Sequence, residues 1–352
     1  MNHRERIMGA IRHERLDGWP TDIWAVPEVW TRLHAHFGVA TNLEVYDLLG
    51  IDGIMEISPP YIGPALKHTA EYQVNEWGMG TRTQAVDSAT YEEQVYFPLA
   101  EAETIADLEA YAWPDPDWYD YGRLPELAAQ FEGRAIGCGY TGVFFLHNLL
   151  RGLATSLEDP LLRPEFTLHF EKRLSDFYTE YHRRCYEALR GKMDLTQVTD
   201  DLGFQTGLLI SPKVFDRFYR PAMQRAMDLA HSFGVTVFHH DDGDCRGLLP
   251  RLVEMGIQVL NPIQWRCGNW DLAALKAAYG AKVCFHGGVD NQFTLPFGSA
   301  DEVRAEVRRL KATLGADGTG LIIAPCHNLQ GLTPLENILA LYETAHEADG
   351  RG

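Results

Sequence analysis

The stretch Val235-Thr236-Val237-Phe238-His239-His240-Asp241-Asp242-Gly243-Asp244 joins a short apolar run to imidazole and carboxylate side chains. An apolar, β-branched run of this length is typical of a buried strand, and Gly243 permits a turn directly after it. Imidazole and carboxylate groups gathered at a strand end can bind a divalent metal or move protons. The alternative is a solvated polar loop in which Asp244 caps the next helix.

Runs of the same kind recur along the chain, separated by stretches of helix length. The helix-length stretches, such as 212–233 and 301–314, carry apolar residues at helical spacing with polar residues opposite. Strands and helices that alternate in this way predict parallel βα units. The predicted strands are Pro20–Trp24, Ile51–Ile57, Arg134–Tyr140, Leu195–Asp200, Val235–His239, Ile257–Asn261, Val283–His286 and Gly320–Ala324.

Eight such units predict an α/β fold of the (β/α)8 TIM-barrel type, with one domain over residues 1–352. A length of 352 residues fits a barrel that carries insertions. The segment 71–118 is rich in aromatic residues, holds Pro114 and Pro116, and does not fit a βα unit. We predict that this segment is an insertion with antiparallel strands and that it covers the barrel mouth.

The composition narrows the possible functions. Hydrophobic residues make up 45% of the chain and charged residues 23%, as in ordinary globular proteins. The net charge of −18 repels nucleic acids and anionic membranes, so a small-molecule substrate is expected instead. A start without a secretory signal and the lack of any run of about 18 apolar residues predict a cytoplasmic protein. The six widely spaced cysteines predict free thiols or ligands rather than disulfides.

Polar residues end nearly all of the predicted strands. The carboxyl ends of the strands of an α/β barrel meet on one face, so residues far apart in the sequence are expected in one pocket. The residues in these positions are Asp22, Tyr140, Asp200, Asp201, His239 to Asp242, Asn261, His286 and Cys326 to Asn328.

Specific roles follow from the chemistry of these side chains. Asp200 and Asp201 are adjacent, and side chains alternate along a strand, so one should face the pocket while the other anchors the loop. Like charges nearby would raise the pKa of a pocket carboxylate and suit it to acid–base work. The candidates for catalysis are Asp200, Asp201, His240 and Tyr140, and those for substrate binding are Gln205, His239, His286, His327 and Asn328.

Two further motifs follow predicted strands. Pro325-Cys326-His327-Asn328 could supply half of a zinc site, because zinc prefers thiolate and imidazole ligands. Otherwise, a buried cysteine in this position acts as a small hydrophobic residue. The paired Gly287 and Gly288 permit a close backbone approach and are expected to form pocket wall, since no basic residue accompanies them.

Taken together, these motifs resemble the uroporphyrinogen decarboxylase superfamily, which includes cobalamin-dependent methyltransferases that pass methyl groups to thiols. The likeness covers nearly the whole chain. The motifs that carry it are Asn2-His3-Arg4-Glu5-Arg6, Asp17 to Trp24, Asp200-Asp201-Leu202-Gly203-Phe204-Gln205, Ile210-Ser211-Pro212, the His-Asp-Asp-Gly stretch, Gly287-Gly288-Val289-Asp290 and Thr333-Pro334-Leu335-Glu336-Asn337.

This resemblance implies a metal site. The family's methyltransferases hold zinc with a His-x-Cys pair after one strand and a Cys after the last, which match His240, Asp242 and Cys326. Asp242 stands where the family has cysteine, so the site would be harder and poorer in thiolate. His239 and His327 lie close enough in the sequence to substitute as ligands.

The resemblance also implies a reaction class. We expect methyl transfer between a small methylated compound and a corrinoid carried by a partner protein, or a thiol, assisted by zinc. The alternative is a decarboxylase of a small acid. A porphyrinogen substrate is disfavoured, because this chain reads Ala25-Val26-Pro27-Glu28 where the decarboxylases carry an arginine-rich segment. A barrel that only binds a ligand would not need so many titratable groups.

Overall fold

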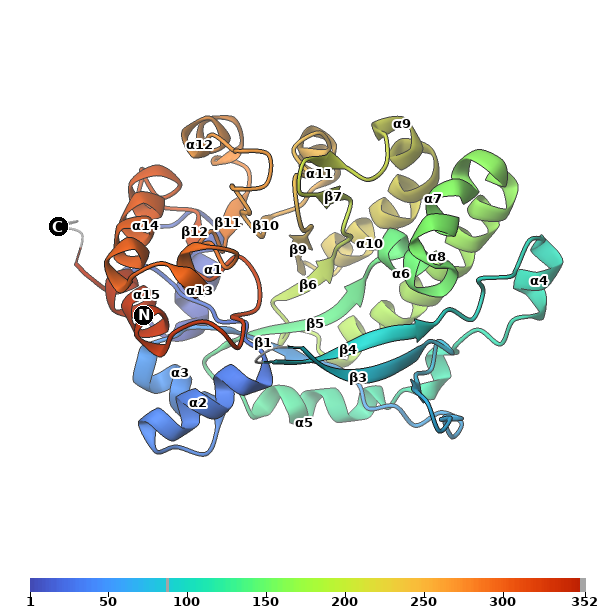
Figure 1. Cartoon of the computed structure of the whole chain (residues 1–352), viewed down its shortest axis with the longest axis horizontal. Helices are drawn as coiled ribbons and strands as arrows, with labels where there is room; N and C mark the ends of the chain where they lie inside the picture. The colour runs from blue at the N-terminus through green and yellow to red at the C-terminus, as the bar shows by residue number, and fades with distance from the viewer. Residues whose placement is uncertain (87–88, 349–352) are drawn as a thin grey trace.

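The structure, a computed structural model, describes residues 1–86 and 89–348. Its centre is a curled, parallel sheet of seven strands in the order β1-β5-β6-β9-β10-β11-β12 (Figure 1). The strands are β1 (Ile54–Ile57), β5 (Ala135–Thr141), β6 (Leu195–Val198), β9 (Thr236–His240), β10 (Val259–Asn261), β11 (Cys284–His286) and β12 (Leu321–Ile322). The parallel α/β architecture and seven of the eight predicted strands are thereby confirmed.

The eighth predicted strand, Pro20–Trp24, is an extended segment with a single parallel bridge, from Thr21 to Ile323, the residue directly after β12. On the side that faces residues 52–54, side-chain carboxylates accept hydrogen bonds from backbone amides that would bond to backbone carbonyls in a complete strand pair. The amides of Ile23 and Ile54 donate to the Asp22 carboxylate, and the amide of Thr21 donates to that of Asp52. The described sheet is therefore a curled seven-stranded one, and the prediction of eight complete strands is corrected at this segment.

The inner face of the sheet closes on an apolar layer. One residue from each of the seven strands packs together with three residues of helix α1 (His3–Ile11). These residues belong to one buried cluster, so all seven strands of the curled sheet share an apolar layer with α1. The strand residues are Ile54, Ala135, Leu195, Phe238, Val259, Cys284 and Ile322, and those of α1 are Ile7, Ala10 and Ile11.

Helices surround the sheet (Figure 1). The predicted helix at 212–233 is found as α9, a π-helical turn and α10 in succession, and the one at 301–314 as α14. Besides α1, the α-helices are α2 (Pro27–Phe37), α3 (Asn42–Leu49), α4 (Ile105–Ala110), α5 (Leu124–Ala129), α6 (Val143–Arg151), α7 (Leu153–Leu162), α8 (Pro164–Ala188), α9 (Pro212–Val214), α10 (Arg220–Ser232), α11 (Leu249–Met255), α12 (Leu272–Tyr279), α13 (Thr294–Phe297), α14 (Ala300–Thr313) and α15 (Leu335–Ala345). The short turns are η1 (Pro116–Trp118), η2 (Tyr121–Arg123) and the π-turn η3 (Phe215–Tyr219).

The predicted insertion contains an antiparallel sheet of β2 (Gln73–Val74), β3 (Gly80–Val86) and β4 (Ala89–Tyr96). Its long β3–β4 ribbon is visible beside the central strands in Figure 1. The ribbon contacts the start of α2 and the loop after β12: the Thr90 amide donates to Glu28 at 2.8 Å, and the Tyr91 hydroxyl donates to Gln330 at 2.5 Å. A second small hairpin, β7 (Gly203–Phe204) and β8 (Gly207–Leu208), follows β6. Among the helices described, none is long and apolar enough to cross a bilayer.

Candidate functional site

A layer of polar side chains lies directly above the apolar layer inside the curled sheet. Residues two positions apart on a strand share a face, so each strand's next inward position can be read from the sequence. On five strands that position holds a polar residue, whereas β5 carries Gly137 there. The polar residues are Glu56, Gln197, His240, Asn261 and His286.

Three side chains at the carboxyl ends of the central strands come together as a candidate metal centre. The Nε2 atom of His240 lies 3.8 Å from Asp242 Oδ1, and the Nε2 atom of His327 lies 3.7 Å from Asp242 Oδ2. One ligand atom from each residue can be chosen so that all three lie within 4.8 Å of one another. Two imidazoles and one carboxylate form a donor set used by zinc and by other divalent transition metals.

The spacing of these donors suits a metal ion. Zinc bonds to nitrogen and oxygen of about 2.0–2.2 Å place neighbouring tetrahedral ligands roughly 3.4 Å apart. The observed separations of 3.7 and 3.8 Å run to the two different oxygens of Asp242, and one donor atom from each residue keeps all three within 4.8 Å of one another. Small side-chain adjustments would therefore complete the coordination.

The protein fixes the orientation and charge of these donors. The Gln264 amide donates to Asp242 Oδ1 at 2.7 Å, and its oxygen accepts from the Gly243 amide at 2.7 Å. Burial raises the pKa of Asp242, although His240 and His327 partly oppose this shift. Burial also lowers the pKa of His327, which favours the neutral imidazole that a metal requires.

The two adjacent aspartates point in different directions. Asp200 is buried and accepts a hydrogen bond from the Phe145 amide, in the first turn of α6, at 2.8 Å. Burial raises its pKa well above the ordinary value. Asp201 is half-buried, and its Oδ1 atom lies 3.9 Å from His240 Nε2. Asp201 therefore faces His240, Asp242 and His327, which we call the metal-type cluster. Asp200 anchors α6 instead.

The thiol of Cys326 does not join the cluster. It is buried and donates to the carbonyl of Ile263 at 3.3 Å, and burial raises its pKa well above the ordinary value. Its neighbour His327 occupies the place beside Asp242 instead. The metal role of Cys326 stays a prediction, and the geometry favours His327 for the third ligand.

The remaining predicted site residues are more scattered. His239 is buried on the face of β9 opposite to His240, donates from Nδ1 to the Val198 carbonyl at 2.7 Å, and has its pKa lowered to about 4 by burial. Gln205 is exposed on the β7–β8 hairpin and accepts from the Cys267 thiol at 3.4 Å. The backbone carbonyl of Asn328 accepts from the Gln330 amide at 2.9 Å.

Tyr140 lies at the end of β5, paired in register with Gln197, and its side chain is 41% exposed. Close packing nevertheless raises the pKa of its hydroxyl well above the ordinary value. The catalytic role of Tyr140 stays a prediction.

Sequence reasoning missed Glu56, which lies inside β1 rather than at its end. Its carboxylate accepts from the Gln197 amide at 3.3 Å. Part of the residue is open to solvent, but the protein atoms packed around the carboxylate raise its pKa to about 7. Gly137 makes room for it, because a Cβ there would lie 2.3 Å from Glu56 Oε1. The signal was available in the sequence, because an acid interrupts the apolar run Ile54-Met55-Glu56-Ile57.

Trp24 was missed as well, although it forms one wall of the site. Its ring centroid lies 5.4 Å from that of His240, and 6.0 Å from those of His286 and His327. The ring meets His327 edge to face, at 87°. Trp24 thus packs the histidines into a fixed arrangement and offers a flat apolar surface beside the metal-type cluster.

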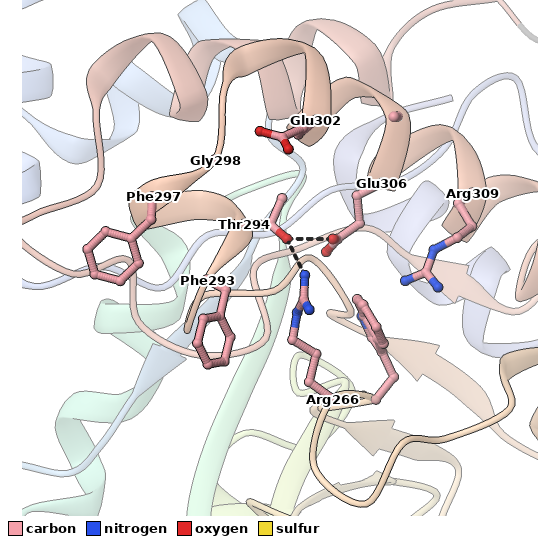
Figure 2. Close-up of a pocket in the computed structure, with 10 residues that line it drawn as sticks. Arg266, Phe293, Thr294, Phe297, Gly298, Glu302, Glu306 and Arg309 are labelled. Carbon is pink, nitrogen blue, oxygen red and sulfur yellow. Dashed lines mark hydrogen bonds between the residues drawn. The ribbon is translucent and has the colours of Figure 1, made fainter.

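A separate hollow of about 520 Å³ lies between α13, α14 and the loop after β10 (Figure 2). Arg266 donates to the Thr294 hydroxyl at 2.9 Å and pairs with Asp290 at 2.6 Å. The Thr294 hydroxyl in turn donates to Glu306 at 2.8 Å. None of the predicted site residues lines this hollow, and most of its charges neutralise one another.

The comparisons with known proteins agree with the fold. Residues 142–348, more than half of the chain, match the family described as uroporphyrinogen decarboxylase (URO-D). A methyltransferase from Methanosarcina mazei aligns with a TM-score of 0.64 and 19% sequence identity, covering 98% of each chain, which shows a shared fold. A B12-independent methionine synthase from Shewanella sp. W3-18-1 aligns with a TM-score of 0.40 and 11% identity, covering 63% of this chain and 64% of that chain, too weakly to support an argument. No curated protein matches. The resemblance found in the sequence is thereby confirmed, and the chain belongs to the uroporphyrinogen decarboxylase family.

Proposed function

We propose that this chain is a methyltransferase that moves a methyl group between a small methylated compound and a corrinoid or thiol, with zinc held by His240, Asp242 and His327. The observation that carries the proposal is the convergence of these three donors within 4.8 Å. The fold shared with a methyltransferase from Methanosarcina mazei supports the reaction class. In this proposal the segment Pro20–Trp24 completes an eight-stranded barrel, and the metal lies in its mouth.

Zinc bound at this cluster would stabilise an acceptor thiol as its thiolate. Asp201, with Oδ1 3.9 Å from His240 Nε2, is placed to accept the proton that the thiol loses. Trp24 supplies an apolar wall beside the ligands, and Tyr140 lies at the end of β5. Together these residues would bind the acceptor, orient it and exclude water from one side.

The methyl carrier in this proposal is a corrinoid on a partner protein, which would dock at the mouth. Exposed apolar side chains follow two of the strands that end there: Phe204 after β6 is 47% exposed, and Leu332 after β12 is 52% exposed. Apolar side chains at the rim of a site are suited to contact with a partner. Docking there would bring the corrinoid close to an acceptor thiol bound at the cluster.

One observation favours a second candidate, decarboxylation of a small acid. Glu56 belongs to the same inward-facing polar layer as His240, and its pKa of about 7 suits a general acid that protonates a carbanion at neutral pH. Methyl transfer to a thiolate does not require this proton. Metal dependence therefore separates the two candidates.

The test is the metal content of protein purified without chelator, measured by elemental analysis, together with demethylation of free methylcobalamin by dithiothreitol. We expect near-stoichiometric zinc in the unaltered protein, and loss of both zinc and activity in His240→Ala, Asp242→Ala and His327→Ala. Cys326→Ala should retain zinc, because its thiol is engaged with Ile263. His36→Ala, an exposed position on α2, is the matched histidine control.

Failure of the wild-type protein to bind zinc, even after zinc is supplied, would overturn the metal-assisted mechanism and leave the decarboxylase. Loss of zinc in Cys326→Ala with retention in His327→Ala would instead return the third ligand to the cysteine predicted from the sequence.

A further inference from the structure

A chain of buried hydrogen bonds runs from the metal-type cluster into the protein. His240 Nδ1 lies 2.6 Å from Asn261 Oδ1, and Asn261 Nδ2 lies 2.7 Å from His286 Nδ1. His286 Nε2 lies 3.0 Å from Asp22 Oδ2. Asp22, Asn261 and His286 are each 1% exposed, so water cannot replace these partners.

The far end of this chain, at Asp22, determines which atom of each hydrogen-bonded pair is the donor. An ionised Asp22 carboxylate can only accept, and its other oxygen already accepts from the amides of Ile23 and Ile54. The His286 nitrogen that faces Asp22, Nε2, must therefore carry the hydrogen. A neutral His286 then has a lone pair on Nδ1, which must meet a donor.

The need for a donor opposite His286 Nδ1 fixes the orientation of the Asn261 amide. Its NH2 group must face His286, so its oxygen must face His240. Because an amide oxygen only accepts, His240 must carry its hydrogen on Nδ1. The lone pair of His240 is thus on Nε2, the atom that lies 3.8 Å from Asp242 and 3.9 Å from Asp201.

We propose that Asp22 is a positioning residue that fixes the tautomer of His240 through His286 and Asn261, and so keeps Nε2 free as a ligand. The assignment of the tautomer follows from these hydrogen bonds and from a neutral His286. Its consequence for zinc affinity rests on the proposed function. Outer hydrogen-bond partners of a ligating histidine commonly change metal affinity 10- to 100-fold.

Nitrogen NMR of metal-free, 15N-histidine-labelled protein tests the tautomer directly. The His240 resonances are identified by their absence from His240→Ala. We expect Nδ1 to be protonated and Nε2 to be unprotonated in the unaltered protein. The opposite pattern at His240 would overturn the proposal without the need for any further variant.

The variant Asp22→Asn tests whether the Asp22 carboxylate fixes which atoms donate along the chain. An amide in place of the carboxylate can donate or accept, so both orientations of the chain become possible and the Nε2-protonated tautomer should appear. Asp52→Asn is the matched control: Asp52 is also 1% exposed and also accepts from the neighbouring segment, at the Thr21 amide, but it lies outside the chain. Equal His240 spectra in the two variants would overturn the proposal.

Zinc titration of the same proteins gives the second measurement. We expect affinity to fall about tenfold in Asp22→Asn and up to about 100-fold in Asn261→Leu, with Asn261→Asp retaining affinity because it still accepts from His240. A shifted tautomer in Asp22→Asn, in a protein that binds no zinc at all, would support this inference while refuting the proposed function. A change in affinity without a change in tautomer would refute the inference alone.

Discussion

Asp200 and Asp201 are consecutive residues with opposite surroundings: the Asp200 carboxylate is buried under the first turn of α6, and that of Asp201 lies 3.9 Å from His240 Nε2. The alternation of side chains along an extended backbone produces this separation. One residue of the pair therefore serves the fold and the other serves the site.

Substitution of the pair should separate stability from activity. Asp200→Ala removes the acceptor for the Phe145 amide and should lower the free energy of unfolding by about 1–2 kcal/mol, whereas Asp200→Asn keeps an acceptor and should cost less. Asp201→Asn should change stability by less than about 0.5 kcal/mol and lower kcat/KM roughly 100-fold. Urea unfolding and steady-state kinetics measure the two effects. Equal losses of stability in Asp200→Ala and Asp201→Asn would contradict this division.

Glu56 should titrate near neutral pH. Its pKa is about 7 in the folded protein, against an ordinary value of 4.5, because burial disfavours the carboxylate. The folded state therefore binds the proton more tightly than the unfolded state does. The resulting stabilisation is complete below pH 4.5 and is lost as the pH rises through 7. We expect the wild-type protein to lose stability relative to Glu56→Gln between about pH 5 and pH 8.

Urea unfolding of the wild type and of Glu56→Gln across this range provides the measurement. Glu92 is an exposed acid on β4, and its variant Glu92→Gln is the control. The wild type should not lose stability relative to this control variant over the same pH range. A wild-type difference that stays constant from pH 5 to pH 8 would show that Glu56 has an ordinary pKa.

Gly243 should not tolerate a side chain. Its φ angle is +83°, and a Cβ at this position would lie 2.6 Å from the backbone of Phe204. We expect Gly243→Ala to cost about 1–3 kcal/mol and to displace Asp242, which lowers metal affinity as well. Gly207→Ala in the nearby β7–β8 hairpin meets no atom within 4 Å and serves as the control. Thermal unfolding of both variants tests the difference, and equal melting temperatures would refute it.

Asp242→Cys should tighten zinc binding. A thiolate is a softer ligand than a carboxylate, and zinc prefers it to a greater extent than manganese does. We expect zinc affinity to rise by about tenfold, or roughly 1.4 kcal/mol, relative to manganese affinity. Competition with a chromophoric chelator measures both metals, and Asp228→Cys on the exposed face of α10 controls for an added thiol. An unchanged ratio of the two affinities would place the metal away from this residue.

Much of the fold could be predicted from the sequence, because short apolar runs alternate with amphipathic stretches of helix length. The segment Pro20–Trp24 shows where this reasoning ends. Its pattern is that of a strand, but Asp22 and Asp52 take up backbone amides that would otherwise bond to a neighbouring strand. A periodicity argument counts apolar residues and does not detect side chains that compete for backbone hydrogen bonds.

The candidate site was only partly predictable, for a different reason. His240, Asp242 and Asp201 follow strands and were found by that rule. Glu56 and Trp24 belong to the same site, but the rule of polar strand ends overlooks an acid inside a strand and an aromatic ring that could equally be core. The choice between Cys326 and His327 depends on side-chain direction, which the order of residues does not specify.

The β3–β4 ribbon touches the rest of the chain at exposed residues, through the backbone amide of Thr90 and the hydroxyl of Tyr91. The Asp22–His286–Asn261 chain, in contrast, is sealed inside the sheet. The two parts can therefore change independently during evolution. Substitutions in the ribbon could alter which compounds are admitted while leaving the reactive histidine untouched. Members of one lineage could diverge in substrate choice and still inherit the same chemistry.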